Sequence, residues 1–201
     1  KVTTITAKFK RKDADEYFLA WTTTPWTLAS NVSLTVGPDV DYIKVKMTAG
    51  DEEGKVFYVA KVLADKVLGE GNYDVLEEMK GKDLEYVEYE QLMPFLSTDK
   101  KAFFVTLGDY VTTVDGTGIV HTAPAFGEDD YRVGRAHHIP VLQLVNPKGE
   151  LTKETPWAGV FVKKADPMVL KDLDEKGLLF DAPKFEHSYP HCWRCKKPII
   201  F

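Results

Sequence analysis

The chain has 201 residues, of which 44% are hydrophobic and 28% are charged. This balance is ordinary for a globular protein with a hydrophobic core, and no apolar run approaches the ~20 residues of a membrane-spanning helix. With 26 basic and 31 acidic side chains the formal net charge is −5, so the surface as a whole does not attract nucleic acid. Local basic clusters at 163–164 and 194–197 remain candidates for RNA contact, with ordinary solvated charge as the alternative.

The two cysteines both lie in HCWRC near the end of the chain, which excludes a disulfide-rich secreted scaffold and favours a reducing, cytoplasmic setting. The first residues, KVTTITAKFKRKD, lack an initiator Met and an apolar signal-peptide core. They alternate as a strand does. We therefore expect the chain to be a piece of a longer protein.

Short alternating or apolar runs along the chain predict many strands. The first two, 1–10 and 16–23, should pair through the charged turn RKDADE. Further strands are expected at 32–36, 41–47, 55–60 and 73–91, the last with a turn at Gly81. In the second half, FFVTLGDYVTTV and TGIVHTA flank Asp115-Gly116 and predict a β-hairpin, and VLQLVN predicts one more strand.

Helix signals are fewer. Thr24 and Pro25 suit an N-cap and a first helical position, with room for only a short turn. Three longer helices are expected at 60–69, at 127–138 with acids in its first turn, and at 165–177. Together these elements predict a mostly β fold, a β-barrel core with helical insertions.

Several common catalytic motifs are absent from the sequence. It contains no Gly-x-Ser-x-Gly elbow, no phosphate-binding loop, no Gly-x-Gly-x-x-Gly fingerprint and no His-Glu-x-x-His pair. What stands out instead is polar chemistry beside backbone breaks, in WTTTPWTLASN (21–31) and GTGIVHTAPAFGEDDY (116–131). Hydroxyls there suit a carbonyl, a ribose or a water, although strand threonines and an N-cap would account for the first stretch taken alone.

In the second stretch, a strand delivers His121 and a helix then opens with Asp129 and Asp130. Strand-end and first-turn side chains project into one mouth, so His121 and one aspartate should share a pocket. A satisfied histidine at a strand end is the equal alternative, and helix N-terminal charge explains at least one aspartate.

These two stretches, with the tail SYPHCWRCKKPIIF, closely resemble the editing domain of isoleucyl-tRNA synthetase over nearly the whole chain. The resemblance implies a closed β-barrel core of the type that valyl, isoleucyl and leucyl enzymes share. It implies an editing domain at 1–186 and a return segment at 187–201 that leads towards a catalytic domain outside this chain. Valyl and leucyl editing domains are the nearby alternatives because their architecture is similar, but they carry Arg before the proline, where this chain has Thr24.

The resemblance assigns catalytic roles to four residues. Asp130 would bind the α-ammonium of the substrate, because a cation needs an anionic partner. Thr22, Thr23 and Thr24 would hold the terminal adenosine and the ester carbonyl and would help to place water. No residue is an obvious general base, so we expect substrate-assisted hydrolysis with a mild pH dependence near neutrality.

Three further residues would bind the amino-acid side chain. His121 would form the wall that meets the extra methyl group of isoleucine, as a size gauge and not necessarily as a base. Thr27 and Trp26 would shape the pocket, whereas Trp21 is expected in the core. For isoleucyl enzymes a synthetic site is known to discriminate one methylene by only ~10–200-fold, which is why a second, hydrolytic site exists.

The expected partners are the 3′ acceptor end of tRNA(Ile), a valine ester or valyl-adenylate, and the rest of the parent synthetase; the fragment should be a monomer without a membrane partner. Editing needs no cofactor, and ATP would be used only in the missing catalytic domain, since His-Ile-Gly-His and Lys-Met-Ser-Lys-Ser are absent. Cys192 and Cys195 have the spacing of half a zinc site, with two free thiols as the alternative. A non-catalytic, tRNA-binding zinc-knuckle module is the rival function.

Overall fold

The computed structural model describes residues 2–95, 102–114, 116–123, 135, 142–181 and 184–185. Its strands are β1 Val2–Thr3, β2 Ile5–Lys10, β3 Glu16–Thr22, β4 Ser33–Val36, β5 Asp41–Met47, β6 Val56–Ala60, β7 Tyr73–Lys80, β8 Phe104–Leu107, β9 Ile119–Thr122, β10 Leu179–Asp181 and β11 Lys184–Phe185. Its helices are η1 Pro25–Ser30, η2 Lys61–Leu63, α1 Ala64–Leu68, η3 Gly81–Leu84 and α3 Val162–Glu175. The prediction of a mostly β fold with a few helices is confirmed.

The main sheet is organised around β3, a mostly buried strand with hydrogen-bonded neighbours on both edges. β2 runs antiparallel along the whole of β3, as predicted for a pair joined through the charged turn. The other edge of β3 is shared. Its first half pairs with β6, and Trp21 near its end pairs with Val120 of β9.

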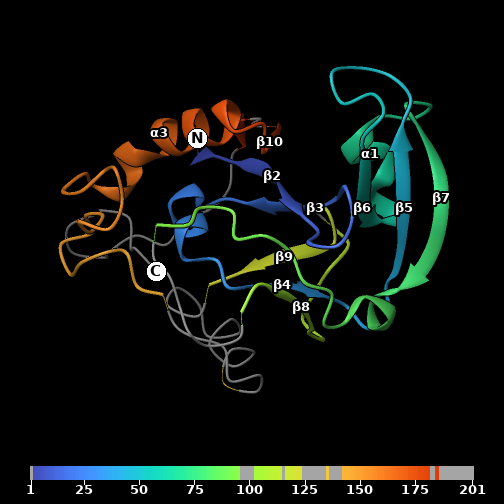
Figure 1. Cartoon of the computed structure of the whole chain (residues 1–201), viewed down its shortest axis with the longest axis horizontal. Coiled ribbons are helices and arrows are strands. Elements are labelled where there is room, and N and C mark those ends of the chain that lie inside the picture. The colour runs from blue at the N-terminus through green and yellow to red at the C-terminus, as the bar shows by residue number, and fades with distance from the viewer. Residues whose placement is uncertain are drawn as a thin grey trace.

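The sheet therefore forks at β3 into two arms, which Figure 1 shows diverging. One arm runs β6–β5–β7, and α1 packs on it through Ala64 and Leu68 against Val45 and Val59. The other arm runs β9–β4–β8. The exposed side chains of β7 mark it as the edge of the first arm.

The prediction of a closed barrel is wrong, because the sheet is open. Among the described residues, the segment between β8 and β2 pairs with them through isolated bridges, Glu88 to Phe104 and Arg11 to Tyr89, and not as a named strand. Tyr86 at the start of the linking segment has a φ of +68°, in the left-handed region that breaks extended backbone. The residues that follow it still bond both neighbours, as Tyr89 N–H does to Phe103 and Glu90 N–H to Lys10, but without forming a regular strand.

The predicted hairpin between 103–114 and 117–123 is also wrong. β8 and β9 do not pair with each other, because β4 lies between them, parallel to β8 and antiparallel to β9. β4, β8 and β9 all have apolar residues on the core side, so their sequence patterns do not show which of them are neighbours. The local turn signal at Asp115-Gly116 did not decide the pairing.

The helix predictions are mostly confirmed. The helix expected at 60–69 is η2 followed by α1, and it ends at Gly69. The helix expected at 165–177 begins three residues earlier, at Val162, and ends before Gly177. The helix expected at 127–138 lies outside the described residues except at Arg135, which is helical.

The core consists of one large cluster, with residues from both arms and from α3, and of smaller clusters around it. α3 packs on η1, where Trp26 lies buried against Leu151, Val162 and Ala165. Figure 1 shows α3 alongside β2 and β10, away from the β6–β5–β7 arm. Within the described residues, no helix has the length and hydrophobicity needed to cross a membrane.

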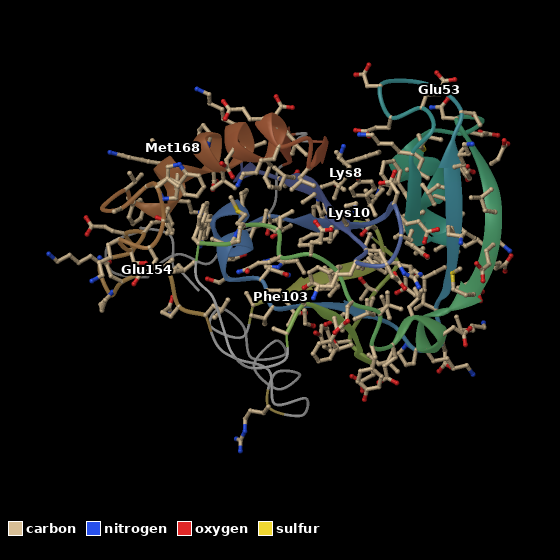
Figure 2. The ribbon with its side chains drawn as sticks, in the orientation of Figure 1. Lys8, Lys10, Glu53, Phe103, Glu154 and Met168 are labelled. Atoms are coloured by element: carbon tan, nitrogen blue, oxygen red, sulfur yellow. The ribbon has the colours of Figure 1, made fainter. Side chains whose placement is uncertain are left out.

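One buried ion pair connects β2 to the loop between β5 and β6. Lys8 on β2 is only 2% exposed, and its Nζ lies 2.8 and 3.1 Å from the two carboxylate oxygens of Glu52. Figure 2 shows Lys8 between α3 and the loop that carries Glu53. A cavity of about 510 Å³ near this ion pair is lined by Glu52, Leu68, Asp174 and Phe180 among others, and no predicted site residue lines it.

Candidate functional site

A turn gathers the threonine hydroxyls at the point where β3 ends. Thr24 leaves the strand with φ −128° and ψ 73°, and Pro25 then begins η1, a 3₁₀ helix rather than an α-helix. The Thr24 N–H donates to the Thr22 hydroxyl at 3.1 Å, and the Thr27 N–H donates to the Thr24 carbonyl at 3.0 Å. Proline suits this place because the first N–H groups of a helix have no partner within it.

The same turn brings the hydroxyl oxygens into contact. The Oγ1 atoms of Thr22 and Thr24 lie 3.2 Å apart, and those of Thr24 and Thr27 lie 3.1 Å apart. Thr24 is the N-cap residue as predicted, but its side chain makes no capping bond. Instead the Thr27 hydroxyl donates to the Thr24 carbonyl at 2.8 Å.

His121 joins this group from β9. It lies opposite Leu34 in the antiparallel pairing of β4 and β9, and its Nε2 is 2.9 Å from the Thr27 hydroxyl. Thr22, Thr27 and His121 are all buried, with exposed fractions of 8%, 4% and 8%. The structure therefore places the two polar stretches of the sequence, 94 residues apart, in one hydrogen-bonded cluster.

The imidazole in this cluster is uncharged. Burial lowers the pKa of His121 to about 3, because a buried ring cannot be solvated when it carries a charge. Both ring nitrogens have polar neighbours, Thr27 at Nε2 and Asn31 at Nδ1, 2.8 Å away. A ring in this state is a poor general base at neutral pH.

The other predicted residues in the first stretch lie around this cluster. Thr23 is half-buried beside it. The Trp26 side chain points to α3, with Lys163 Nζ 4.5 Å from its ring centroid. Trp21 is half-buried, and its ring limits the space at Gly116. The roles predicted for these side chains remain predictions.

Asp130, Asp129, Cys192 and Cys195 lie outside the described residues, so the predicted ammonium site and half zinc site stay predictions. Elsewhere, within the ranges that the structure describes, no group of three or more His, Cys, Asp or Glu side chains is placed to hold a metal ion.

Two buried residues that the sequence did not single out complete the cluster. The Asn31 side chain lies between His121 and the Tyr89 hydroxyl, which donates to Asn31 Oδ1 at 2.5 Å. Asn31 closes the WTTTPWTLASN stretch, so its position was a usable signal. Tyr89 lies 58 residues further along the chain in an unremarkable strand-like run, and no sequence signal connects it to the site.

Known proteins with similar sequences point to one family. None of the protein-family models matches the chain. An isoleucine–tRNA ligase of Clostridium novyi is 51% identical over the whole chain, and one of Pyrococcus abyssi is 46% identical over 93% of it. Over its whole length the chain corresponds to a segment of isoleucine–tRNA ligases. It spans only 19% of the Clostridium relative and 18% of the Pyrococcus relative.

Solved structures of leucyl-tRNA synthetase domains share the fold of this chain. A leucyl-tRNA synthetase CP1 domain, whose structure is titled "The crystal structure of GlLeuRS-CP1", superposes with a TM-score of 0.69 at 15% identity, over 92% of this chain and all of that one. The editing domain of the Plasmodium knowlesi cytosolic leucyl-tRNA synthetase gives 0.69 at 11% identity, over 91% and 97% of the two chains. The cluster at the end of β3 is the candidate functional site of this chain.

Proposed function

We propose that the chain hydrolyses valine wrongly esterified to tRNA(Ile), as the editing domain of a larger isoleucyl-tRNA synthetase. The observation that carries the proposal is the buried cluster in which Thr22, Thr24 and Thr27 meet His121 through hydrogen bonds. It combines the two sequence stretches on which the editing resemblance depends.

The neutral imidazole suits the proposed task of sorting by size. Valine differs from isoleucine by one methylene, and burying a methylene is worth only about 0.8 kcal/mol. A fixed wall can reject the larger side chain by steric overlap instead. His121 supports that role, because an uncharged ring can contact an aliphatic group without the cost of burying a charge there.

The proposed reaction is the attack of water on the ester carbonyl carbon. The bond from that carbon to the ribose oxygen breaks, the ribose oxygen takes up a proton, and valine leaves as the free acid. With His121 neutral and engaged at both nitrogens, we assign the placement of water to threonine hydroxyls, backbone groups and the terminal ribose hydroxyl. Asp130 would hold the α-ammonium by a charge-assisted hydrogen bond.

The partners and setting follow from the same proposal. The tRNA(Ile) 3′ end and the remainder of the synthetase would be the partners of a monomeric fragment in the cytoplasm. No cofactor takes part in editing, and the fragment would not activate amino acids. In the full-length protein, Cys192 and Cys195 would provide two thiolates of a four-ligand zinc site.

The test is the rate of hydrolysis of Val-tRNA(Ile) and Ile-tRNA(Ile) by this chain, by an Asp130→Ala variant and by an Asp109→Ala control. Asp109 is an exposed aspartate beyond the far end of β8, so its loss removes the same charge away from the cluster. We expect preferential loss of the valyl ester with the wild type and the control, and no loss with Asp130→Ala.

If neither ester is cleaved, the assay is repeated with the full synthetase. Failure there too would reject editing by this domain and favour a non-catalytic tRNA-binding module. If the chain instead prefers a noncognate ester that a leucyl or valyl synthetase forms, its editing specificity is of the leucyl or valyl type.

A further inference from the structure

We propose that Tyr89 and Asn31 are positioning residues that fix His121 in its Nε2–H tautomer and hold its ring against the Thr27 hydroxyl. The inference rests on the proposed editing function for its kinetic consequence, but its structural content stands on hydrogen-bond geometry alone. Neither residue needs to touch the substrate.

The orientation of the Asn31 amide is set by a neighbour that can only accept. Asn31 Nδ2 lies 2.9 Å from the Ser33 carbonyl oxygen, which has no proton to donate. The NH₂ group must therefore face Ser33, and Oδ1 must face the Tyr89 hydroxyl, which donates to it. Burial raises the pKa of Tyr89, so its hydroxyl keeps the proton that it donates.

The same NH₂ group determines the tautomer of His121. Its second proton faces His121 Nδ1 at 2.8 Å, so this ring nitrogen must accept and cannot carry a proton. In a neutral imidazole the proton then lies on Nε2. Nε2–H donates to Thr27 Oγ1 at 2.9 Å, and the Thr27 hydroxyl in turn donates to the Thr24 carbonyl.

The path that begins at Tyr89 is rigid as well as polar. Tyr89 is fully buried, and its ring packs edge-on against Phe9 at 5.5 Å and Phe103 at 6.1 Å between centroids. Phe103 is labelled in Figure 2 next to the start of β8. A tyrosine that cannot move its hydroxyl gives Asn31 one orientation, and Asn31 gives His121 one tautomer and one place.

Three variants separate this role from general packing. Tyr89→Phe removes only the hydroxyl, while Asn31→Asp replaces the donor at Nδ1 with a carboxylate that can only accept. Tyr58→Phe is the control, because Tyr58 is also a buried tyrosine but its hydroxyl bonds Glu16 and Arg11, away from His121. Thermal unfolding of each variant checks that it is folded.

The first readout is the ¹⁵N spectrum of the ring nitrogens in histidine-labelled chain at pH 7, with His121 identified by its loss in His121→Gln. We expect the neutral Nε2–H pattern in the wild type and in Tyr58→Phe, and a proton on Nδ1 in Asn31→Asp. In Tyr89→Phe the Nε2–H signal should broaden or mix with the other tautomer. A wild-type ring protonated on Nδ1, or an unchanged ring in both site variants, overturns the proposal.

The second readout is the ratio of valyl to isoleucyl ester hydrolysis. We expect Tyr89→Phe to lower it by about tenfold, as the loss of one neutral hydrogen bond would, and Tyr58→Phe to leave it unchanged. A ratio that stays constant in Tyr89→Phe while the tautomer changes overturns the link to specificity. A wild type without hydrolysis rejects the editing function, and the spectra still decide the tautomer assignment.

Discussion

Lowering the pH should destabilise this protein through His121 before most carboxylates titrate. The folded ring has a pKa of about 3, whereas a histidine in the unfolded chain titrates near 6.5. Because the folded pKa is the lower one, the unfolded state binds a proton that the folded state refuses. The stabilisation is therefore complete above pH ~6.5 and is lost as the pH falls from there towards 3.

The size of the effect follows from the two pKa values. Each pH unit below 6.5 lowers the free energy of unfolding by about 1.4 kcal/mol, so the loss between pH 7.5 and pH 5 should be about 2 kcal/mol. Other groups titrate as well, so the wild type must be compared with His121→Gln. Glutamine offers a donor and an acceptor of similar reach but has no proton to gain in this range.

The assay is urea unfolding followed by tryptophan fluorescence at pH 7.5, 6.5, 5.5 and 5.0 for both proteins. We expect the difference in unfolding free energy, wild type minus variant, to shrink by about 2 kcal/mol across the series. A difference that stays constant with pH would mean that His121 titrates equally in the folded and unfolded chains. It would refute the buried, neutral imidazole on which the proposed site depends.

Two further perturbations test the environment of the site and the packing of the sheet. Asp166 on α3 is 5% exposed and its Oδ1 has no hydrogen-bond partner, and burial raises its pKa to about 7. Because this folded pKa is raised, the wild type should lose stability as the pH rises from ~4 through 7, and Asp166→Asn should not. The variant should therefore melt at a higher temperature than the wild type at pH 8 but not at pH 4. Equal melting temperatures at pH 8 would contradict the prediction. Gly81→Ala would place a Cβ only 1.9 Å from the Gly37 carbonyl oxygen, so we expect the free energy of unfolding in urea to fall by at least about 3 kcal/mol. Gly50 has a positive φ but open space around it, so Gly50→Ala should lower that free energy by only about 1 kcal/mol.

Local sequence patterns predicted strands and helices correctly where the signal lies within the element or next to it. The pairing of β2 with β3 follows from two apolar runs separated by a short charged turn. The helix ending at Gly69 and the helix ending before Gly177 follow from a glycine with positive φ after a periodic segment. In each case the signal and its consequence lie within about twenty residues.

The pairing of distant strands did not follow from local patterns. The turn at Asp115-Gly116 favoured a hairpin between 103–114 and 117–123, but β4 takes both partners. In the folded sheet, Ser33 and Thr35 of β4 bond the Thr106 hydroxyl of β8, and Thr35 also bonds that of Thr122 on β9. The choice of partners therefore depends on contacts between residues far apart in the sequence. The positive φ of Tyr86, at the start of the segment that links β8 to β2, is likewise a tertiary outcome at an ordinary residue.

The candidate site divides in the same way. The sequence by itself identified the threonines, the proline break and His121 as candidates for the site, because their residue types and positions beside backbone turns indicate polar chemistry. Only the tertiary structure decided that His121 reaches Thr27, and that Asn31 and Tyr89 stand behind it. Hydrogen bonds depend on distances of about 3 Å and on direction, and residues 58 to 94 positions apart acquire both only when the sheet assembles.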